Sequence, residues 1–263
     1  MTTLPYSLQI TPHPISLSVG TIRKPTLDDI GKLTFDAFNF YEFLLKMTPE
    51  TYYTKLCEDA EARKWESMTE EERESVTLIQ AIESSKNLQT LYVEALNFFF
   101  VETVEYCDGL FYVLAVDNID QVKNEEDIVG IITPQTFDEL LYVLQQVCCI
   151  AEAPEENIDD LSFKNDVARK LYEKMQKAKK EAAKKKAYDK NLTLPNIISA
   201  VATKHPSINY TNIWGLTLFQ LNDVFGRMQT NVAFDISVTR VSVWGDEKKQ
   251  FDPSIWYQNQ YDK

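Results

Sequence analysis

Residues 26–45 read TLDDIGKLTFDAFNFYEFLL, and this stretch gives the clearest indication of the fold class. Thr26 can cap a helix, because its hydroxyl can accept a hydrogen bond from a free N–H of the first turn. Asp28 and Asp29 follow, where the helix dipole favours negative charge. Apolar residues then recur at helical spacing, at Leu27, Ile30, Leu33, Ala37, Phe38, Tyr41, Leu44 and Leu45. We therefore predict one amphipathic helix over residues 26–45.

Comparable signals predict further helices along the chain. A threonine followed by proline suits a helix start, since proline lacks the N–H that the first turn leaves unpaired. Thr69 and Glu72 form a capping-box pattern, and the helix after them is expected to run through Ile82. The predicted starts are Thr48-Pro49, Thr69, the segment after Asn87, and Thr133-Pro134, whose helix is expected to end near Ile150.

Two segments change to the alternating pattern of β-strands. Residues 15–19, Ile-Ser-Leu-Ser-Val, predict a short edge or docking strand at the end of a proline-containing N-terminal arm. Residues 101–106 and 110–116 flank Cys107-Asp108-Gly109, and the Asp-Gly pair predicts a β-hairpin. We expect a mainly α fold with a small β element, made of this hairpin and the short N-terminal strand, which places the chain in the α+β class.

The composition limits the kinds of partner. The formal net charge is −13, which opposes attraction to nucleic acid and to anionic lipid. No apolar run approaches the roughly 20 residues that a membrane-spanning helix needs, and no secretory signal opens the chain, so we expect a cytoplasmic protein. The four cysteines, Cys57, Cys107, Cys148 and Cys149, lack metal-binding spacing and are interpreted as free thiols.

A shift in composition predicts the domain boundaries. Residues 151–163 are acidic, whereas residues 164–190 are rich in lysine. The lysine-rich helix either presents a positive stripe to an acidic partner or nucleic acid, or is a solvated face, and the solvated face is the commoner case. The predicted parts are a helical module with the β-hairpin (1–153), a linker with the lysine-rich helix (154–190), a C-terminal helical module (191–245) and an extended aromatic tail (246–263).

Catalytic and metal-binding constellations are not evident in the sequence. The two histidines, His13 and His205, have no ligand-type partner at helical spacing, and no phosphate-binding or nucleophile-elbow motif occurs. The acidic pairs Asp28-Asp29 and Asp159-Asp160 could hold Mg²⁺, but such pairs at helix starts are more often caps. We therefore expect no enzyme activity, no cofactor and no metal site.

The C-terminal third predicts two helices around a polar link. Asn212 is expected to cap the second helix, along which Trp214, Leu218, Leu221, Phe225 and Met228 alternate by four and three. Residues 229–244 carry conflicting signals, because Val232, Phe234, Ile236 and Val238 also alternate as in a strand. We favour a continued helix, since few breakers interrupt it.

Large apolar side chains in three segments are candidates for binding a partner. Aromatic anchors are enriched in protein interfaces, although most such side chains lie in their own core, and that alternative is favoured for the first two segments. The candidates are Phe98, Phe99 and Phe100, the helical seam Trp214, Leu218, Leu221 and Phe225, and the tail residues Trp256 and Tyr257.

Two blocks of sequence resemble a known family. The blocks are VGTIRKPTLDDI (19–30) with FYEFLL (40–45), and LPNIISAV (194–201) with NYTNIW (209–214) and LTLFQLNDVF (216–225). They resemble tail assembly chaperone-like proteins of bacteriophages and prophages of Gram-positive bacteria. The resemblance implies a non-catalytic protein of the host cytoplasm that binds a tail protein, such as the tape-measure protein, during tail assembly. The alternative is a minor tail or baseplate component of the virion, and either kind of protein could also bind a second copy of itself.

Overall fold

The computed structural model describes residues 3–57, 59–151, 191–246, 250–258 and 261. These residues form a mainly helical fold with two small antiparallel sheets, which confirms the predicted class. The chain divides into two compact units, residues 1–151 with 212–263 and residues 152–211. The four-part division made from the sequence stays a prediction, and the predicted lysine-rich helix lies outside the described residues.

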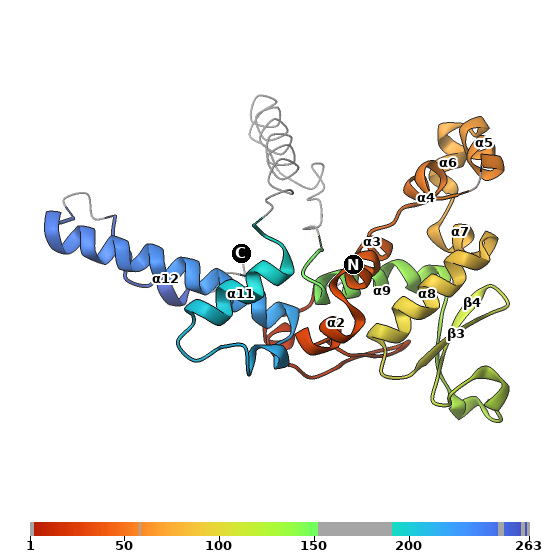
Figure 1. The fold of residues 1–263 in the computed structure, drawn as a ribbon. Coiled ribbons are helices and arrows are strands. Elements are labelled where there is room, and N and C mark those ends of the chain that lie inside the picture. The colour runs from red at the N-terminus through yellow and green to blue at the C-terminus, as the bar shows by residue number, and fades with distance from the viewer. Residues whose placement is uncertain (1–2, 58, 152–190, 247–249, 259–260, 262–263) are drawn as a thin grey trace, which may run out of the picture. The chain divides into compact units, whose positions relative to one another are not determined.

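The elements follow one another as Figure 1 shows. The helices of the first unit are α1 (Tyr6–Gln9), α2 (Leu27–Leu33), α3 (Phe35–Leu45), α4 (Pro49–Lys55), α5 (Asp59–Ser67), α6 (Glu70–Ser75), α7 (Leu78–Ser84), α8 (Lys86–Phe99), α9 (Pro134–Val147) and α12 (Leu218–Trp244). Its strands are β1 (Ile15–Leu17), β2 (Gly20–Ile22), β3 (Thr103–Cys107), β4 (Leu110–Leu114) and β5 (Ile128–Ile132). Its short 3-10 turns are η1 (Ile119–Gln121), η2 (Glu125–Asp127), η4 (Ile213–Gly215) and η5 (Ile255–Tyr257). The described part of the second unit contains α11 (Leu194–Lys204).

The predicted helix over residues 26–45 is two helices, α2 and α3, so the expectation of one continuous helix is wrong. Thr26 caps α2 in a capping box with Asp29, as the sequence indicated. Thr34 interrupts the helix with a φ of 90° and then caps α3, its hydroxyl accepting a hydrogen bond from the N–H of Ala37. Both helices still bury their apolar sides, because the break redirects the chain without ending the pattern.

Capping residues mark the next helix starts correctly, but one helix end differs. Pro49 is the first residue of α4, and Thr69 forms a capping box with Glu72 at the start of α6. The helix predicted to continue through Ile82 stops at Ser75. A separate helix, α7, begins at Leu78, and the N–H of Thr77 at its start donates a hydrogen bond to the side chain of Gln80. A second capping sequence therefore outweighs the continuous apolar spacing.

The predicted hairpin is β3 and β4, and a third strand joins them. Asp108 and Gly109 form the two-residue turn with φ values of 49° and 83°, the left-handed pair that a tight hairpin requires. The sequence prediction missed β5, which pairs antiparallel with β4 and gives the strand order β3-β4-β5. Helix α8 packs against β3 (Figure 1), and α9 follows β5 directly after Thr133, ending at Val147 instead of near Ile150.

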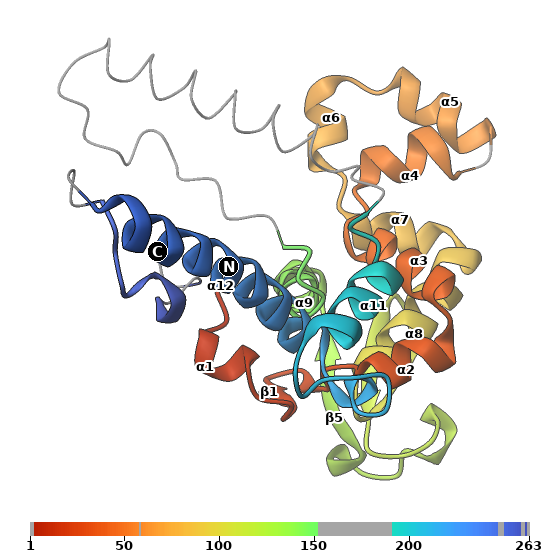
Figure 2. The same ribbon diagram turned by 60° about the vertical axis from the view of Figure 1, so that its left-hand side comes forward.

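The predicted N-terminal strand is half of a second hairpin. β1 pairs with β2, and the N–H of Val101 donates to the carbonyl of Thr21 at 2.9 Å. The turn between these strands lies against the three-stranded sheet, since a Cβ built on Gly130 would come within 2.7 Å of the backbone of Val19. Figure 2 labels β1 and β5 in this region. The N-terminal arm is thus part of the core of the first unit.

Aromatic rings join the sheet to the helices. The ring of Phe137 in α9 stacks on Phe111 in β4, with centroids 5.9 Å apart, and meets the edge of Tyr92 in α8 at 5.8 Å. The Tyr92 hydroxyl donates to the carbonyl of Leu44 at 2.8 Å, which satisfies the polar end of a buried ring. These contacts make α3, α8, α9 and the sheet one hydrophobic core.

One carboxyl group in α3 makes stability depend on pH. Burial raises the pKa of Glu42 to about 7, against the opposing effect of Lys46. The folded state therefore holds this proton above the pH at which the unfolded chain releases it. The contribution of Glu42 is fully present below its unfolded pKa of 4.5 and is lost as the pH rises through about 7.

We expect Glu42→Gln to stabilise the protein at pH 8 by about 1–2 kcal/mol, because the variant has no half-buried carboxylate to ionise. At pH 5 the variant and the natural protein should differ much less. Thermal unfolding at both pH values measures the difference, with Glu94→Gln on the exposed side of α8 as the control. Equal effects of Glu42→Gln at the two pH values would contradict the assignment.

Residues 229–244, for which the sequence gave conflicting signals, are helical, as favoured. They are the second half of α12. The predicted cap is wrong, since α12 begins at Leu218 with Thr217 as its cap and Gln220 completing the capping box. Asn212 instead precedes the 3-10 turn η4, which contains Trp214. The tail predicted as extended contains the turn η5, which packs against α12.

Candidate partner-binding surface

The first predicted segment, Phe98 to Phe100, lies in the core of the first unit. Phe99 and Phe100 are 0% and 2% exposed. Phe98 is half-buried, with its ring 5.7 Å from that of Tyr41 and the guanidinium of Arg23 above it at 5.4 Å. The alternative favoured in the sequence, ordinary core aromatics, therefore describes Phe99 and Phe100, which offer no surface to a partner.

The second predicted segment also fixes the start of α12 to the body of this unit. Leu218 and Leu221 are buried, while Trp214 and Phe225 are half-buried. The N–H of Leu27 donates to the carbonyl of Leu216 at 2.8 Å, so the chain before α12 is attached to the start of α2. Leu218 and Leu221 are thus internal packing residues and not the floor of an exposed groove.

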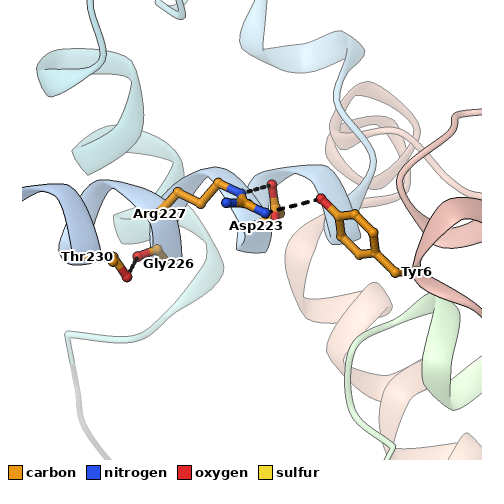
Figure 3. A network of polar contacts seen from close by, with 5 residues as sticks. All are labelled: Tyr6, Asp223, Gly226, Arg227 and Thr230. Atoms are coloured by element: carbon orange, nitrogen blue, oxygen red, sulfur yellow. Dashed lines mark hydrogen bonds and ion pairs between the residues drawn. The ribbon is translucent and has the colours of Figure 1, made fainter. Parts of the chain in front are cut away.

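A polar network at the first turns of α12 fixes the N-terminal arm (Figure 3). The side chain of Asp223 is only 9% exposed, and its two oxygens accept hydrogen bonds from Nε of Arg227 at 3.2 and 3.1 Å. Arg227 also donates to the hydroxyl of Tyr6 at 3.4 Å, and the amide of Gln220 donates to the carbonyl of Ile10 at 2.9 Å. These bonds join segments more than 200 positions apart in the sequence.

We expect Arg227→Ala to lower the free energy of unfolding by about 2 kcal/mol, because it leaves a buried carboxylate without its cation. A matched control is Lys32→Ala, which breaks the i,i+4 pair between Lys32 and Asp28, whose side chains are 73% and 53% exposed. That exposed pair should contribute little to stability, because solvent screens both charges. Urea unfolding of both variants measures the difference, and equal losses would contradict a structural role for the Asp223–Arg227 pair.

A pocket of about 390 Å³ lies beside this network. Its lining includes Gln9, Gln146, Asn222 and Tyr261, and the ring of Tyr261 stacks on that of Tyr6 with centroids 5.0 Å apart. Burial and the nearby carboxylate of Asp223 raise the pKa of Tyr261, so its hydroxyl stays protonated. Tyr261 thus forms part of the wall of this pocket.

The thiol in this pocket is not an activated nucleophile. Desolvation of its sulfur raises the pKa of Cys149 to about 11, although the residue as a whole is exposed, and a hydrogen bond with Asn222 opposes that rise. Nucleophilic cysteines need the thiolate form, which a pKa this high disfavours at neutral pH. We therefore assign no catalytic role to Cys149.

Two other chemical groups singled out in the sequence have structural roles. Asp29 completes the α2 capping box, and Nδ1 of His205 accepts hydrogen bonds from the N–H groups of Ser207 and Ile208. Within the described ranges, no three side chains of histidine, cysteine, aspartate or glutamate gather as a metal site would require. Among those same residues, no helix has the length and apolar character needed to span a bilayer. The pair Asp159-Asp160 lies outside the described residues.

The third predicted segment is exposed. Ile255, Trp256 and Tyr257 are 42%, 51% and 61% exposed, and we call these three residues of η5 the tail surface. The rings of Trp256 and Tyr257 meet edge to face at 5.1 Å. Contiguous exposed aromatic side chains of this kind are typical of protein-binding sites.

The backbone beneath the tail surface is held by two carboxylates. Asp246 accepts hydrogen bonds from the N–H groups of Gln250 and Phe251, and these bonds lower its pKa. Asp252 accepts from both the N–H and the hydroxyl of Ser254, which lowers its pKa as well. The ring of Phe251 contacts Phe234 of α12 at 5.8 Å. The tail surface is thus a fixed turn on α12, which reduces the entropy that binding would cost.

The second half of α12 adds exposed apolar side chains that the sequence reading did not select. They are Val232, Ile236, Val238, Val243 and Trp244, between 37% and 76% exposed. Three of them, Val232, Ile236 and Val238, belong to the alternating pattern that gave competing strand and helix signals. Exposed apolar side chains on a helix, where no other described element covers them, indicate a binding surface.

Comparison with known proteins gives one match, to the C-terminal part of the chain. A search of curated proteins and a search of solved structures each found no match. A family model described as the YomV second domain matches residues 182–261, which include α11, α12 and the tail surface. The family is derived from phages and prophages of the Bacillus SPbeta type. The C-terminal part of the chain is therefore similar to a phage-derived domain.

Proposed function

We propose that this chain is a non-catalytic phage assembly protein that binds a tail structural protein through the tail surface on α12. The observation that carries the proposal is a braced turn with Ile255, Trp256 and Tyr257 exposed together, within the region similar to a phage-derived domain. Rigid, clustered aromatic side chains provide most of the binding energy in many protein interfaces. We further propose the tape-measure protein as the partner and the host cytoplasm as the place of binding.

A binding role without chemistry agrees with how the titratable groups are used. Asp29, Glu72 and Asp246 accept hydrogen bonds from backbone N–H groups, and Asp223 pairs with Arg227. The net charge of −13 disfavours a nucleic-acid partner. Enzymes instead bring such groups together with perturbed pKa values around a cleft.

Co-purification tests the proposal. The tagged chain is expressed with the neighbouring phage tail genes, and mass spectrometry identifies the proteins in the soluble complex and in finished particles. We expect a tail structural protein to co-purify in the soluble fraction while the chain itself is missing from particles. Stoichiometric presence in particles would make the chain a minor tail or baseplate component, and recovery of neither would refute a role in tail assembly.

A further inference from the structure

The second half of α12 carries an exposed stripe that is separate from the tail surface. Successive residues of a helix are about 100° apart, so Val232, Ile236, Thr239 and Val243 lie within an arc of roughly 60°. We call these four residues the α12 stripe. Val232, Ile236 and Val243 are 39%, 64% and 65% exposed, and Thr239 is exposed as well.

The α12 stripe continues the side of the helix that is buried at its start. By the same helical geometry, Leu218 and Leu221 share this side, and they are 5% and 0% exposed. The stripe residues follow one another at steps of four, three and four, which is the spacing of a coiled-coil seam. The side of α12 that packs on the core at its start therefore continues along the helix as the α12 stripe, where no described residue covers it.

The segment that leads into the tail surface contacts the opposite side of the helix. Phe234, which contacts Phe251 of the tail, is about 200° from Val232 and about 160° from Ile236 around the helix axis. The described part of the tail therefore packs away from the α12 stripe and leaves it open.

Two exposed charges flank the α12 stripe, one on each side. Asp235 directly precedes Ile236, and Arg240 directly follows Thr239, five residues later. Among the described residues neither of them forms an ion pair, although Arg240 lies near enough to Asp246 to contribute to the lowered pKa of that carboxyl. In a parallel two-stranded coiled coil, residues at these two flanking positions on different helices face each other, with the spacing i to i+5.

We propose that the α12 stripe binds a second copy of this chain as a short, parallel, in-register coiled coil. Ile236 and Val243 occupy equivalent seam positions in successive heptads, at which parallel dimers often carry β-branched residues, and Val232 and Thr239 fill the other two seam positions. Asp235 of each copy meets Arg240 of the other, giving two symmetric ion pairs. In an antiparallel pairing the same flanking position of each helix would face its equivalent, so neither charge would meet one of opposite sign.

The proposal is independent of the proposed function. The tail surface remains accessible in the dimer, because the segment that leads into it contacts the opposite side of α12 from the seam. A monomeric chain could still bind a tail protein, and a dimer could form without one. Measurement of mass on the purified chain alone therefore tests the dimer separately.

Sedimentation equilibrium of the full chain over a range of concentrations tests the seam. We expect a dimer that dissociates on dilution, and only monomer for Ile236→Asp, because the substitution buries two carboxylates together. Val238→Asp, two residues away and on the side of the helix that carries Phe234, should dimerise like the natural chain. Circular dichroism confirms that both variants fold. A natural chain that stays monomeric, or equal behaviour of the two variants, would overturn the proposal.

Charge exchange and cross-linking test the parallel register. Asp235→Arg or Arg240→Asp alone should weaken the dimer about fivefold or more, through loss of two weak ion pairs, and the double exchange should restore it. Ile236→Cys should form a disulfide-linked dimer under mild oxidation, whereas the natural chain with its own four cysteines should not. If the dimer of the doubly exchanged variant were weaker than the dimers of both single variants, or if no cross-link formed at position 236, this register would be overturned.

Discussion

Replacing Gly130 by alanine should lower the free energy of unfolding by about 2–3 kcal/mol. A Cβ at this position would lie 2.7 Å from the Cα, carbonyl carbon and carbonyl oxygen of Val19. These are backbone atoms of the turn between β1 and β2, so no flexible side chain can move aside. Strand β5 would have to separate from the N-terminal hairpin, and the melting temperature should fall by roughly 4–12 °C.

Gly215→Ala is the matched control for this prediction. A Cβ built on Gly215 meets nothing within 4 Å, and its backbone φ is not in the left-handed region. The control should be neutral or slightly stabilising, by up to about 1 kcal/mol, because alanine has fewer unfolded conformations to lose. A Gly130→Ala protein that melts with the natural chain would show that the hairpin does not pack on β5 as described.

The same glycine explains why the sequence did not reveal β5. Ile128, Val129, Ile131 and Ile132 form a short apolar run, but Gly130 interrupts it and has a low strand propensity. The glycine is needed because the backbone of another segment approaches the strand at that point. A contact distant in sequence therefore determines the residue, and local patterns do not report it.

Helices were predictable where one capping residue stood alone, and less so where two competed. Thr48-Pro49 and Thr69 fixed the starts of α4 and α6. At Thr34 and Thr77 the apolar spacing continues across a residue that caps a new helix, so periodicity predicted one helix where two exist. Asn212 and Thr217 are both good caps by composition, and the pairing of Leu216 with Leu27 favours the later start.

The candidate binding residues divide by burial, which the sequence alone could not provide. Phe99 and Phe100 lie at the end of α8 and are buried. Leu221 lies on the buried first turns of α12. Trp256 and Tyr257 have few apolar neighbours in sequence, and they remain exposed. Large aromatic residues in a polar segment were therefore the better indication of a surface than a cluster within a helix.

The double substitution Trp256→Ser with Tyr257→Ser should weaken binding of the tail protein by about a hundredfold or more, since each anchor can contribute around 2 kcal/mol. Both side chains are more than half exposed, so the free energy of unfolding should change little. Binding and stability are thus expected to separate in this variant.

A matched control is Phe40→Ser with Phe43→Ser, which removes another exposed aromatic pair from α3. Those rings are 6.1 Å apart and their side chains are 38% and 37% exposed. The control removes a similar type of side chain from a surface remote in sequence, so it distinguishes a specific site from general stickiness. Thermal unfolding of both double variants checks that they fold.

The most direct measurement is the amount of tail structural protein that co-purifies with each of three tagged chains, the natural one and the two double variants, expressed with the neighbouring tail genes. We predict equal recovery with the natural chain and with Phe40→Ser/Phe43→Ser, and almost none with Trp256→Ser/Tyr257→Ser. Equal recovery with all three chains would contradict binding through the tail surface, and no recovery with the natural chain would contradict the proposed function itself.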